Sequence, residues 1–313
     1  MRANAAVRVE LGARDDVHVR ELRSDVPLVL RLTGRRPGGA APSAAPPPGT
    51  PATPPSVTVH LVGAAAGPLA GDDLRLDISV GAGVRLVLRS VAAMVALPGR
   101  GAGDRPSRLT VTAQVGPGGE LDFQPEPTVV AAGADHAALT EITLDPTARL
   151  WLREEILLGR FGESAGSFHS MLRVDISPGA GVEPRTGAST ETEPAVGTVL
   201  RGGTIGLLRH ELALGPDTPG LHGPAQLGAA RAVGSLVVAG PEWAGPGPES
   251  VIVGRGSQPG QDDHAGRGGG EAALMPLAGP GYLVTALAPD AVSLRRLLAT
   301  APGSHPSGRR PAR

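Results

Sequence analysis

Residues 74–88, LRLDISVGAGVRLVL, contain the pattern that most clearly indicates the fold. Apolar and polar side chains alternate from Leu74 to Val80, a Gly-Ala-Gly turn follows, and the alternation resumes from Val84 to Leu88. Alternation with a period of two is typical of a β-strand with one buried face, and glycine-rich turns separate such strands. The stretch therefore predicts a strand, a tight turn and a second strand.

Three later stretches, residues 109–123, 139–152 and 172–184, repeat this pattern around turns of their own. The four turns begin at residues 81, 116, 145 and 177. Each unit leaves one strand face to be buried, and successive units can bury it by stacking as in a solenoid. Four hairpins of a β-sandwich explain the same pattern. Both arrangements stay open, and both predict an all-β scaffold, either solenoid-like or sandwich-like.

Further elements complete an all-β fold with one or two short helices. Strands are expected at residues 27–32, 57–62, 205–214 and 282–288. Residues 289–298 predict a helix whose N-cap is Asp290, because an aspartate there can accept a bond from a free backbone N–H. Residues 221–231 are a candidate for a second helix.

The chain is expected to form a single domain over residues 1–313, with insertions rather than two halves of different composition. Residues 37–55 contain eight prolines, which neither a strand ladder nor a helix interior accommodates, so they predict a flexible insertion. Residues 244–272, rich in glycine and proline, predict a mobile loop. Residues 302–313 predict a disordered tail.

Composition excludes several classes of function. The net charge of −1 gives no electrostatic footprint for nucleic acid. The absence of cysteine excludes disulfides, cysteine–zinc sites and cysteine nucleophiles, and the absence of lysine excludes a P-loop. With no apolar signal region and no run of about 18 apolar residues, a soluble cytoplasmic protein is expected, without membrane contact.

Residues 162–166, GESAG, match the G-x-S-x-G nucleophile elbow of serine hydrolases. A chain with 46 glycines gives such a match readily by chance. An elbow also needs a helix after the serine, whereas an alternating strand pattern follows Ser164. We interpret the pentapeptide as a loop between strands, and keep an esterase-type serine hydrolase using Ser164 as the alternative function.

Two acidic pairs remain, Asp72-Asp73 and Glu154-Glu155. On a strand, Glu154 and Glu155 face opposite sides, so one of them can point inward. Such a carboxylate is either paired with Arg160 in or near the core, or it is an oxygen ligand for a divalent cation in passage. The eight histidines are scattered, with no H-x-H or H-x-x-x-H pair, so no local motif predicts a tight metal site.

Three stretches, in order, resemble a known family, the urease accessory protein UreD (also called UreH). They are GPLAGDDLRLDISVGAGVRLVLRSVAA (67–93), LDFQPEPTVVAAGADH (121–136) and LWLREEILLGRFGE (150–163). The residues that match the family motifs are Gly67, Pro68, Leu69, Gly71 and Asp72 in the first stretch, Pro125, Glu126 and Pro127 in the second, and Glu155, Gly159 and Arg160 in the third. Phe123 stands where the family often has tryptophan. Residues 37–55 and 244–272 depart from the compact members.

The resemblance implies a fold dominated by β-strands and a role that is not enzymatic. Proteins of this family act as chaperones of metallocentre assembly, with UreF and the GTPase UreG, and deliver nickel to apo-urease. They contact urease themselves, and an internal passage has been proposed to carry the nickel. By this resemblance UreF, UreG (through UreF) and apo-urease are the expected partners. Asp72 and Glu155 are the candidate transit ligands, with no tightly bound cofactor.

Overall fold

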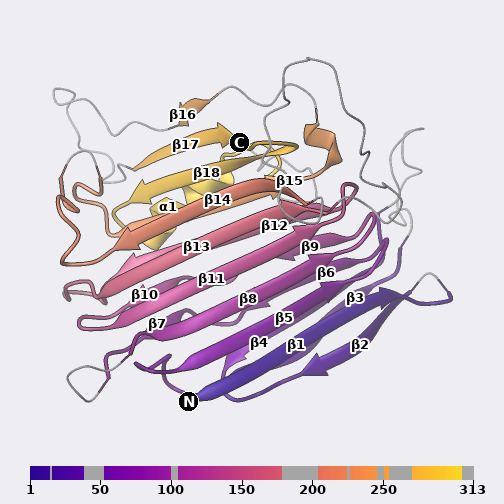
Figure 1. Cartoon of the computed structure of the whole chain (residues 1–313), viewed down its shortest axis with the longest axis horizontal. Coiled ribbons are helices and arrows are strands. Elements are labelled where there is room, and N and C mark those ends of the chain that lie inside the picture. Colours follow the sequence, from indigo (N-terminus) through magenta and orange to yellow (C-terminus); the bar gives the residue numbers. More distant parts are fainter. Residues whose placement is uncertain are drawn as a thin grey trace, which may run out of the picture.

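Two β-sheets lie face to face in the computed structural model (Figure 1). The structure describes residues 1–14, 16–38, 53–99, 105–177, 204–223, 226–244, 250–253 and 270–304. Strands dominate these residues, which confirms the all-β fold class. No helix among them is long and apolar enough to cross a membrane.

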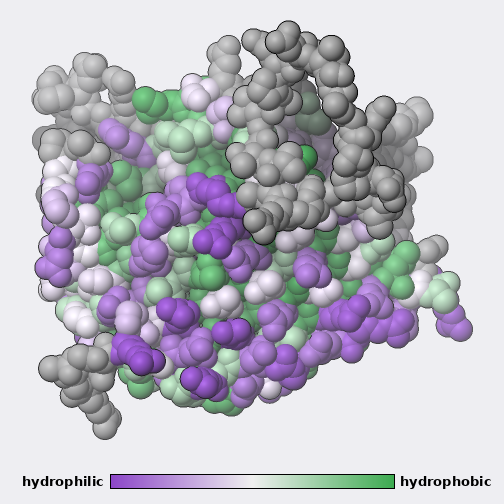
Figure 2. Space-filling view, viewed as in Figure 1, coloured by the Kyte–Doolittle hydropathy of each residue, from purple (hydrophilic) through white to green (hydrophobic). Residues whose placement is uncertain are grey.

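The first sheet, sheet A, has seven strands. In spatial order they are β14 (Ile205–Leu214), β13 (Ser167–Ile176), β11 (Asp135–Leu144), β8 (Ser107–Val115), β5 (Asp73–Val80), β1 (Arg2–Leu11) and β2 (Val17–Arg23). The five central strands are parallel, and the edge strands β14 and β2 are antiparallel to their neighbours. The outer face of sheet A carries many hydrophilic side chains with hydrophobic ones between them (Figure 2).

The second sheet, sheet B, is the wider of the two. Its main path runs β16 (Val251–Val253), β17 (Glu271–Pro276), β18 (Gly281–Ala288), β15 (Ala232–Ala239), β12 (Arg149–Leu158), β9 (Glu120–Phe123), β6 (Arg85–Ser90), β4 (Ser56–Gly63) and β3 (Leu28–Arg36). The short strands β7 (Met94–Ala96) and β10 (Thr128–Val130) pair with each other, and β10 also pairs with β12. The helix α1 (Ala291–Ala299) packs against β15 and β18, and a 3-10 turn, η1 (Pro241–Trp243), follows β15.

The repeated units stack as a solenoid. In each of the pairs β5–β6, β8–β9 and β11–β12, the first strand belongs to sheet A and the second to sheet B. The two strands of a unit do not pair with each other; each pairs in parallel with the same strand of the next unit. The hairpin alternative is therefore wrong. The second strand of the fourth unit, within 172–184, lies outside the described residues.

The tight turns between the paired strands also stack on one another. The N–H of Gly83 donates to the carbonyl of Pro117 at 2.9 Å, and the N–H of Gly118 donates to Thr147 Oγ1 at 2.9 Å. A Cβ atom on Gly119 would lie 2.7 Å from the carbonyl oxygen of Gly81 in the turn below. Close backbone approach between successive turns is the reason for glycine at this position.

The main core lies between the two sheets. Leu, Val, Ile and Ala side chains from the inner faces fill it, among them Leu76, Leu86, Leu121 and Leu150, each at most 1% exposed. A second cluster lies on the outer face of sheet B, where Leu294 and Leu298 of α1 cover β15 and β18. The alternation read from the sequence therefore marks the inner faces correctly.

Most expected elements outside the repeats are confirmed. The strands expected at 27–32, 57–62, 205–214 and 282–288 are β3, β4, β14 and β18. The helix expected at 289–298 is α1, and Asp290 caps it by accepting a bond from the N–H of Ser293. The second helix expected at 221–231 is wrong: its described residues form turns, and Gly228 there has a positive φ of 53°.

The predicted loop and tail are only partly described. Within 244–272, the structure has β16 and the start of β17, so two strands stand where one loop was expected. Residues 39–52 of the proline-rich insertion and 305–313 of the tail lie outside the described residues. The described start of the tail is packed: Trp151 donates its indole N–H to the carbonyl of Gly303 at 3.0 Å, and Ser304 is buried.

The stacked turns give a test of the solenoid. Gly119→Ala places a methyl group against backbone of the neighbouring turn, so we expect the free energy of unfolding to fall by about 1–3 kcal/mol in a urea titration. Gly63→Ala is the matched control, because nothing lies within 4 Å of its Cβ position. Equal stability of the two variants would contradict the close stacking.

Candidate functional site

The two ends of the stack differ in the length of their connections. Tight turns lead from sheet A to sheet B at one end. At the other end longer segments lead back from sheet B to sheet A; they are residues 64–72, 91–106, 124–134 and 159–166. Most of the residues that match the family motifs lie in these longer segments. The stacking therefore gathers at one end residues that are far apart in the sequence.

A pocket of about 500 Å³ opens at this end between the sheets. Its walls are apolar side chains of both inner faces, such as Leu28 of β3 and Leu74 of β5. All three motif stretches contribute to its lining, through Gly67, Pro68, Pro125, Glu126 and Arg160. The three motifs are separate in the sequence, and the fold brings them to one pocket.

Exposed apolar side chains lie on the connections beside this pocket. Leu69 is 41% exposed, Val91 is 56% exposed, and Phe161 is fully exposed. Val91 itself lines the pocket, and Phe161 follows Arg160, which also lines it. Single exposed apolar residues are ordinary, but several around an apolar pocket are typical of a surface that another protein covers.

Asp72 organises the first of these connections. Its side chain is buried and accepts the N–H of Leu69 at 2.9 Å, and it also forms an ion pair with the terminal ammonium of Met1. Its carbonyl accepts the N–H of Arg108 at 2.7 Å, which joins the turn to β8. Asp72 does not line the pocket. Its place in the structure is that of a turn residue whose carboxylate is already bonded.

Glu155 lies on the outer face of sheet B, 2% exposed, between two arginines. Arg153 is 3.2 Å from one of its oxygens, and Arg295 of α1 lies 2.6 Å from the other. Arg295 also pairs with Glu126 at 3.0 Å, and the hydrogen bonds that it donates to Glu155 and Glu126 raise the pKa of Arg295. One arginine of the helix thus joins the second and third motifs.

The expected pairing of Glu155 with Arg160 is wrong. Arg160 instead pairs with Glu163 at 2.7 Å in the exposed loop after β12, where Gly159 turns the chain with a φ of 80°. The hydrogen bond from Arg160 lowers the pKa of Glu163 to about 2. The true partner, Arg295, lies 140 residues from Glu155 in the chain, so no local spacing could have indicated it.

Glu154 is the carboxylate that points between the sheets. Its two oxygens each accept the hydroxyl of Ser170 on β13 at 2.9 Å, so the bond bridges sheet B to sheet A. It lines an internal cavity of about 70 Å³. Burial raises the pKa of Glu154 to about 7. Alternation along the strand correctly predicts that one glutamate of this pair points inward, but that residue is Glu154 and not the candidate ligand Glu155.

The internal cavity at Glu154 adjoins the larger pocket. Met94, Leu109, Val111, Phe123, Pro125, Glu126 and Thr128 line both. The pocket at the end of the stack therefore leads inward toward the carboxylate of Glu154.

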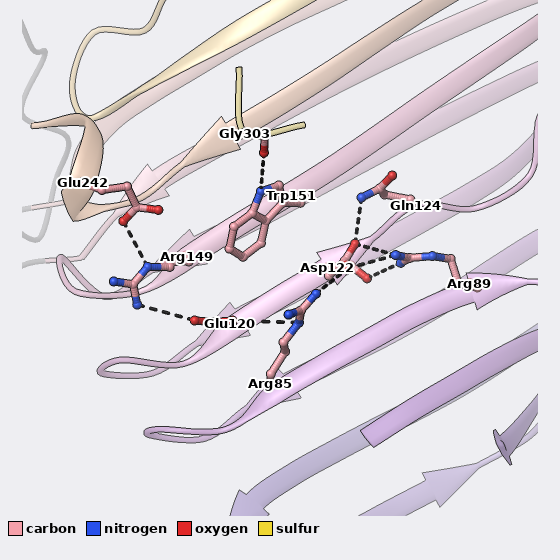
Figure 3. A network of polar contacts seen from close by, with 9 residues as sticks. All are labelled: Arg85, Arg89, Glu120, Asp122, Gln124, Arg149, Trp151, Glu242 and Gly303. Carbon is pink, nitrogen blue, oxygen red and sulfur yellow. Dashed lines mark hydrogen bonds and ion pairs between the residues drawn. The ribbon is translucent and has the colours of Figure 1, made fainter. Parts of the chain in front are cut away.

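A polar network on the outer face of sheet B holds the second motif stretch in place (Figure 3). Asp122, 1% exposed, pairs with Arg85 and Arg89 at 2.9 Å each and accepts the amide of Gln124 at 2.9 Å. Arg153 then donates to the side chain of Gln124 at 3.3 Å. Through Arg153 the network reaches Glu155, and from there Arg295 and Glu126.

The GESAG pentapeptide connects β12 to β13, two strands of different sheets. A nucleophile elbow joins a strand to a helix. No described histidine forms a hydrogen bond or ion pair with Ser164. The geometry is that of the loop predicted from the sequence. Among the described residues, moreover, no three His, Asp or Glu side chains converge as a metal site.

Comparison with known proteins finds one family that matches nearly the whole chain. A family model described as UreD urease accessory protein matches residues 4–304. The urease accessory protein UreD of Frankia alni is 58% identical over 307 residues, covering 95% of this chain and 91% of its own. The UreD proteins of Frankia casuarinae and Streptomyces avermitilis are 54% and 36% identical, covering 96% and 95% of this chain and 89% and 95% of their own.

The network around Asp122 gives a stability prediction. Asp122→Ala leaves Arg85 and Arg89 facing each other without their shared carboxylate, so we expect the free energy of unfolding to fall by about 3 kcal/mol. Glu141→Ala is the control, because it removes an exposed pair with Arg173 and should cost at most about 1 kcal/mol. Urea titration measures both, and a neutral Asp122→Ala would contradict the anchoring role.

The raised pKa of Glu154 predicts a pH dependence of stability. Between the ordinary value of 4.5 and about 7, the folded protein keeps a proton that the unfolded chain releases. The contribution of Glu154 to stability is therefore present at low pH and lost as the pH rises through this window. Glu154→Gln lacks this loss, so it should gain up to about 3 kcal/mol over wild type between about pH 5 and about pH 8. Chemical unfolding at both pH values checks this; a constant difference contradicts it.

Proposed function

The chain belongs to the UreD urease accessory protein family, and from this premise we propose that it is a non-enzymatic scaffold of urease maturation. In this role it binds UreF, through UreF the GTPase UreG, and apo-urease, in the cytoplasm. It supports delivery of nickel to the urease metal centre and holds no tightly bound cofactor itself.

The proposal rests on one observation: residues of all three family motifs line the same pocket. Side chains from all three line it, and exposed apolar residues such as Val91 and Phe161 lie around it. A partner protein that covers this end would bury apolar surface, which favours association. The ion pairs of Arg295 with Glu126 and Glu155 hold two of the connections in a fixed arrangement.

For nickel we propose a route that passes Glu154. Asp72 and Glu155 were the ligands expected from the sequence, yet ammonium or guanidinium groups already pair with both carboxylates. A cation would have to displace these partners. Among the described residues Glu154 has one hydrogen-bond partner, the hydroxyl of Ser170, and it lines the cavity that adjoins the pocket. Carboxylate and hydroxyl oxygens are weak ligands for nickel, which suits a cargo that must be released.

Deletion of the gene tests the accessory role. We expect urease to be produced in normal amount but with little nickel, as measured by mass spectrometry of the purified enzyme. Normal nickel content and activity in the deletion strain would overturn the proposed function.

The route is tested separately by Glu154→Gln, which removes the negative charge and keeps a group that can bond Ser170. Nickel in urease should fall severalfold while the variant remains folded and bound to UreF. Glu141→Gln, on the outer face of sheet A, is the control. A normal nickel content of urease with Glu154→Gln would contradict the proposed route but not the accessory role.

A further inference from the structure

Sheet B extends beyond sheet A on one side. Within the described residues, β14 is the last strand of sheet A, and it lies over β15, where Leu214 packs with Val233. Sheet B continues past β15 with β18, β17 and β16. The inner face of these strands has no partner strand among the described residues. A cleft of about 540 Å³ lies there, between β14 and the strands β15, β18 and β17.

The cleft runs along the free edge of β14. Five consecutive residues, 210–214, line it. Successive side chains of a strand point to opposite faces of the sheet. A cleft lined by five consecutive residues therefore runs along the backbone edge of the strand. Among the described residues this edge has one backbone contact, from the N–H of Ala278 to the carbonyl of Leu207, at the end of the strand away from the cleft. Unpaired strand edges are templates for pairing with an added chain.

Two buried polar atoms of residues that line this cleft have no hydrogen-bond partner among the described residues. They are Ser235 Oγ on β15 and His210 Nδ1 on β14, and Ser235 is 1% exposed. Both residues line the cleft, one from each sheet. A buried polar group without a partner costs about 1–3 kcal/mol, so a bound group that bonds both atoms would recover this free energy.

The charged side chains that line the cleft are acidic. Its charged residues are Glu211 and Glu271, both exposed, and no described arginine lines it. Glu211 has a histidine partner, His169, at 2.7 Å, and Glu271 has no ion pair with a described residue. The remaining walls are mostly apolar, from Leu212, Leu214 and their neighbours. The lining is complementary to an apolar segment that carries a lysine or arginine.

A second copy of this chain does not fit the cleft. Pairing β14 with its own copy in one continuous sheet requires a two-fold axis perpendicular to sheet A. The strands β18, β17 and β16 of each copy would then lie under sheet A of the other, where that copy already has its own sheet B. A single extended segment is thin enough to enter between β14 and β17.

We propose that the edge of β14 binds an extended segment of a partner protein by strand addition. The segment carries apolar residues, a lysine or arginine that meets Glu211 or Glu271, and an inward polar side chain that bonds Ser235 and His210. Main-chain hydrogen bonds to the strand edge supply affinity, and the pockets for alternate side chains supply specificity. This binding does not depend on nickel delivery.

A positional-scanning library of blocked hexapeptides tests the proposal on the full chain. Five strand residues span about 16 Å at roughly 3.3 Å each, which a hexapeptide covers. We expect selection of lysine or arginine at one position, and protection of β14 amides from hydrogen exchange when the selected peptide binds. The double variant Glu211→Gln/Glu271→Gln should bind that peptide about fivefold more weakly or worse.

Two controls make the result decisive. Glu141→Gln removes a carboxylate from the outer face of sheet A and should bind the peptide as wild type does. Ser235→Ala should weaken the selection for a polar residue at the peptide position whose side chain points inward, and should leave the other positions unchanged. The absence of a basic preference, equal binding by the double variant, or no protection of β14 overturns the proposal. Any of these results leaves the test of the accessory role, nickel in urease from the deletion strain, unaffected.

Discussion

Each strand–turn–strand unit has one apolar face that it can bury only against the units beside and opposite it. This constraint puts the first strand of every unit in sheet A and the second in sheet B, with parallel pairing in both. It also keeps the turns at one end equally short, because units in register must turn at the same level. Gly119, whose Cβ position is 2.7 Å from a backbone oxygen of the neighbouring turn, shows how little space remains there.

The same constraint leaves the part of the outer face of sheet B that α1 does not cover to polar residues that need partners. Asp122 is buried on that face, and burial of an unpaired carboxylate would be costly, so Arg85, Arg89 and Gln124 surround it. Buried ion pairs add little net stability compared with apolar packing, but removal of one partner is expensive. A chain of such pairs from Asp122 to Arg295 therefore fixes positions, and the positions that it fixes include Glu126 and Glu155 of the motifs.

The sequence was sufficient wherever the physics is local. Period-two alternation and glycine turns predicted the stacked units, and Asp290 predicted the start of α1. The choice between stacked units and hairpins was open, because it depends on which strands pair across about thirty residues. The choice between Glu154 and Glu155 was open for a similar reason, because alternation predicts only that they face opposite sides of the sheet. Their partners, Ser170 for Glu154 and Arg295 for Glu155, come from distant elements and show which side each one faces.

The polar and pocket-lining residues that could bind a partner lie where the repeating pattern stops. Within a regular unit most inner side chains are apolar and packed in the core, so they offer little to a partner. At the long connections the motif residues line a pocket, and Glu154 interrupts the apolar interior beside it. At β14 the described part of sheet A ends before sheet B does, and Ser235 and His210 are left unpaired. Departures from local consistency of this kind are expected at functional sites rather than at random. Both departures lie at borders of the stack, one at its open end and one at its open side, so a partner can reach each of them without any change in the core.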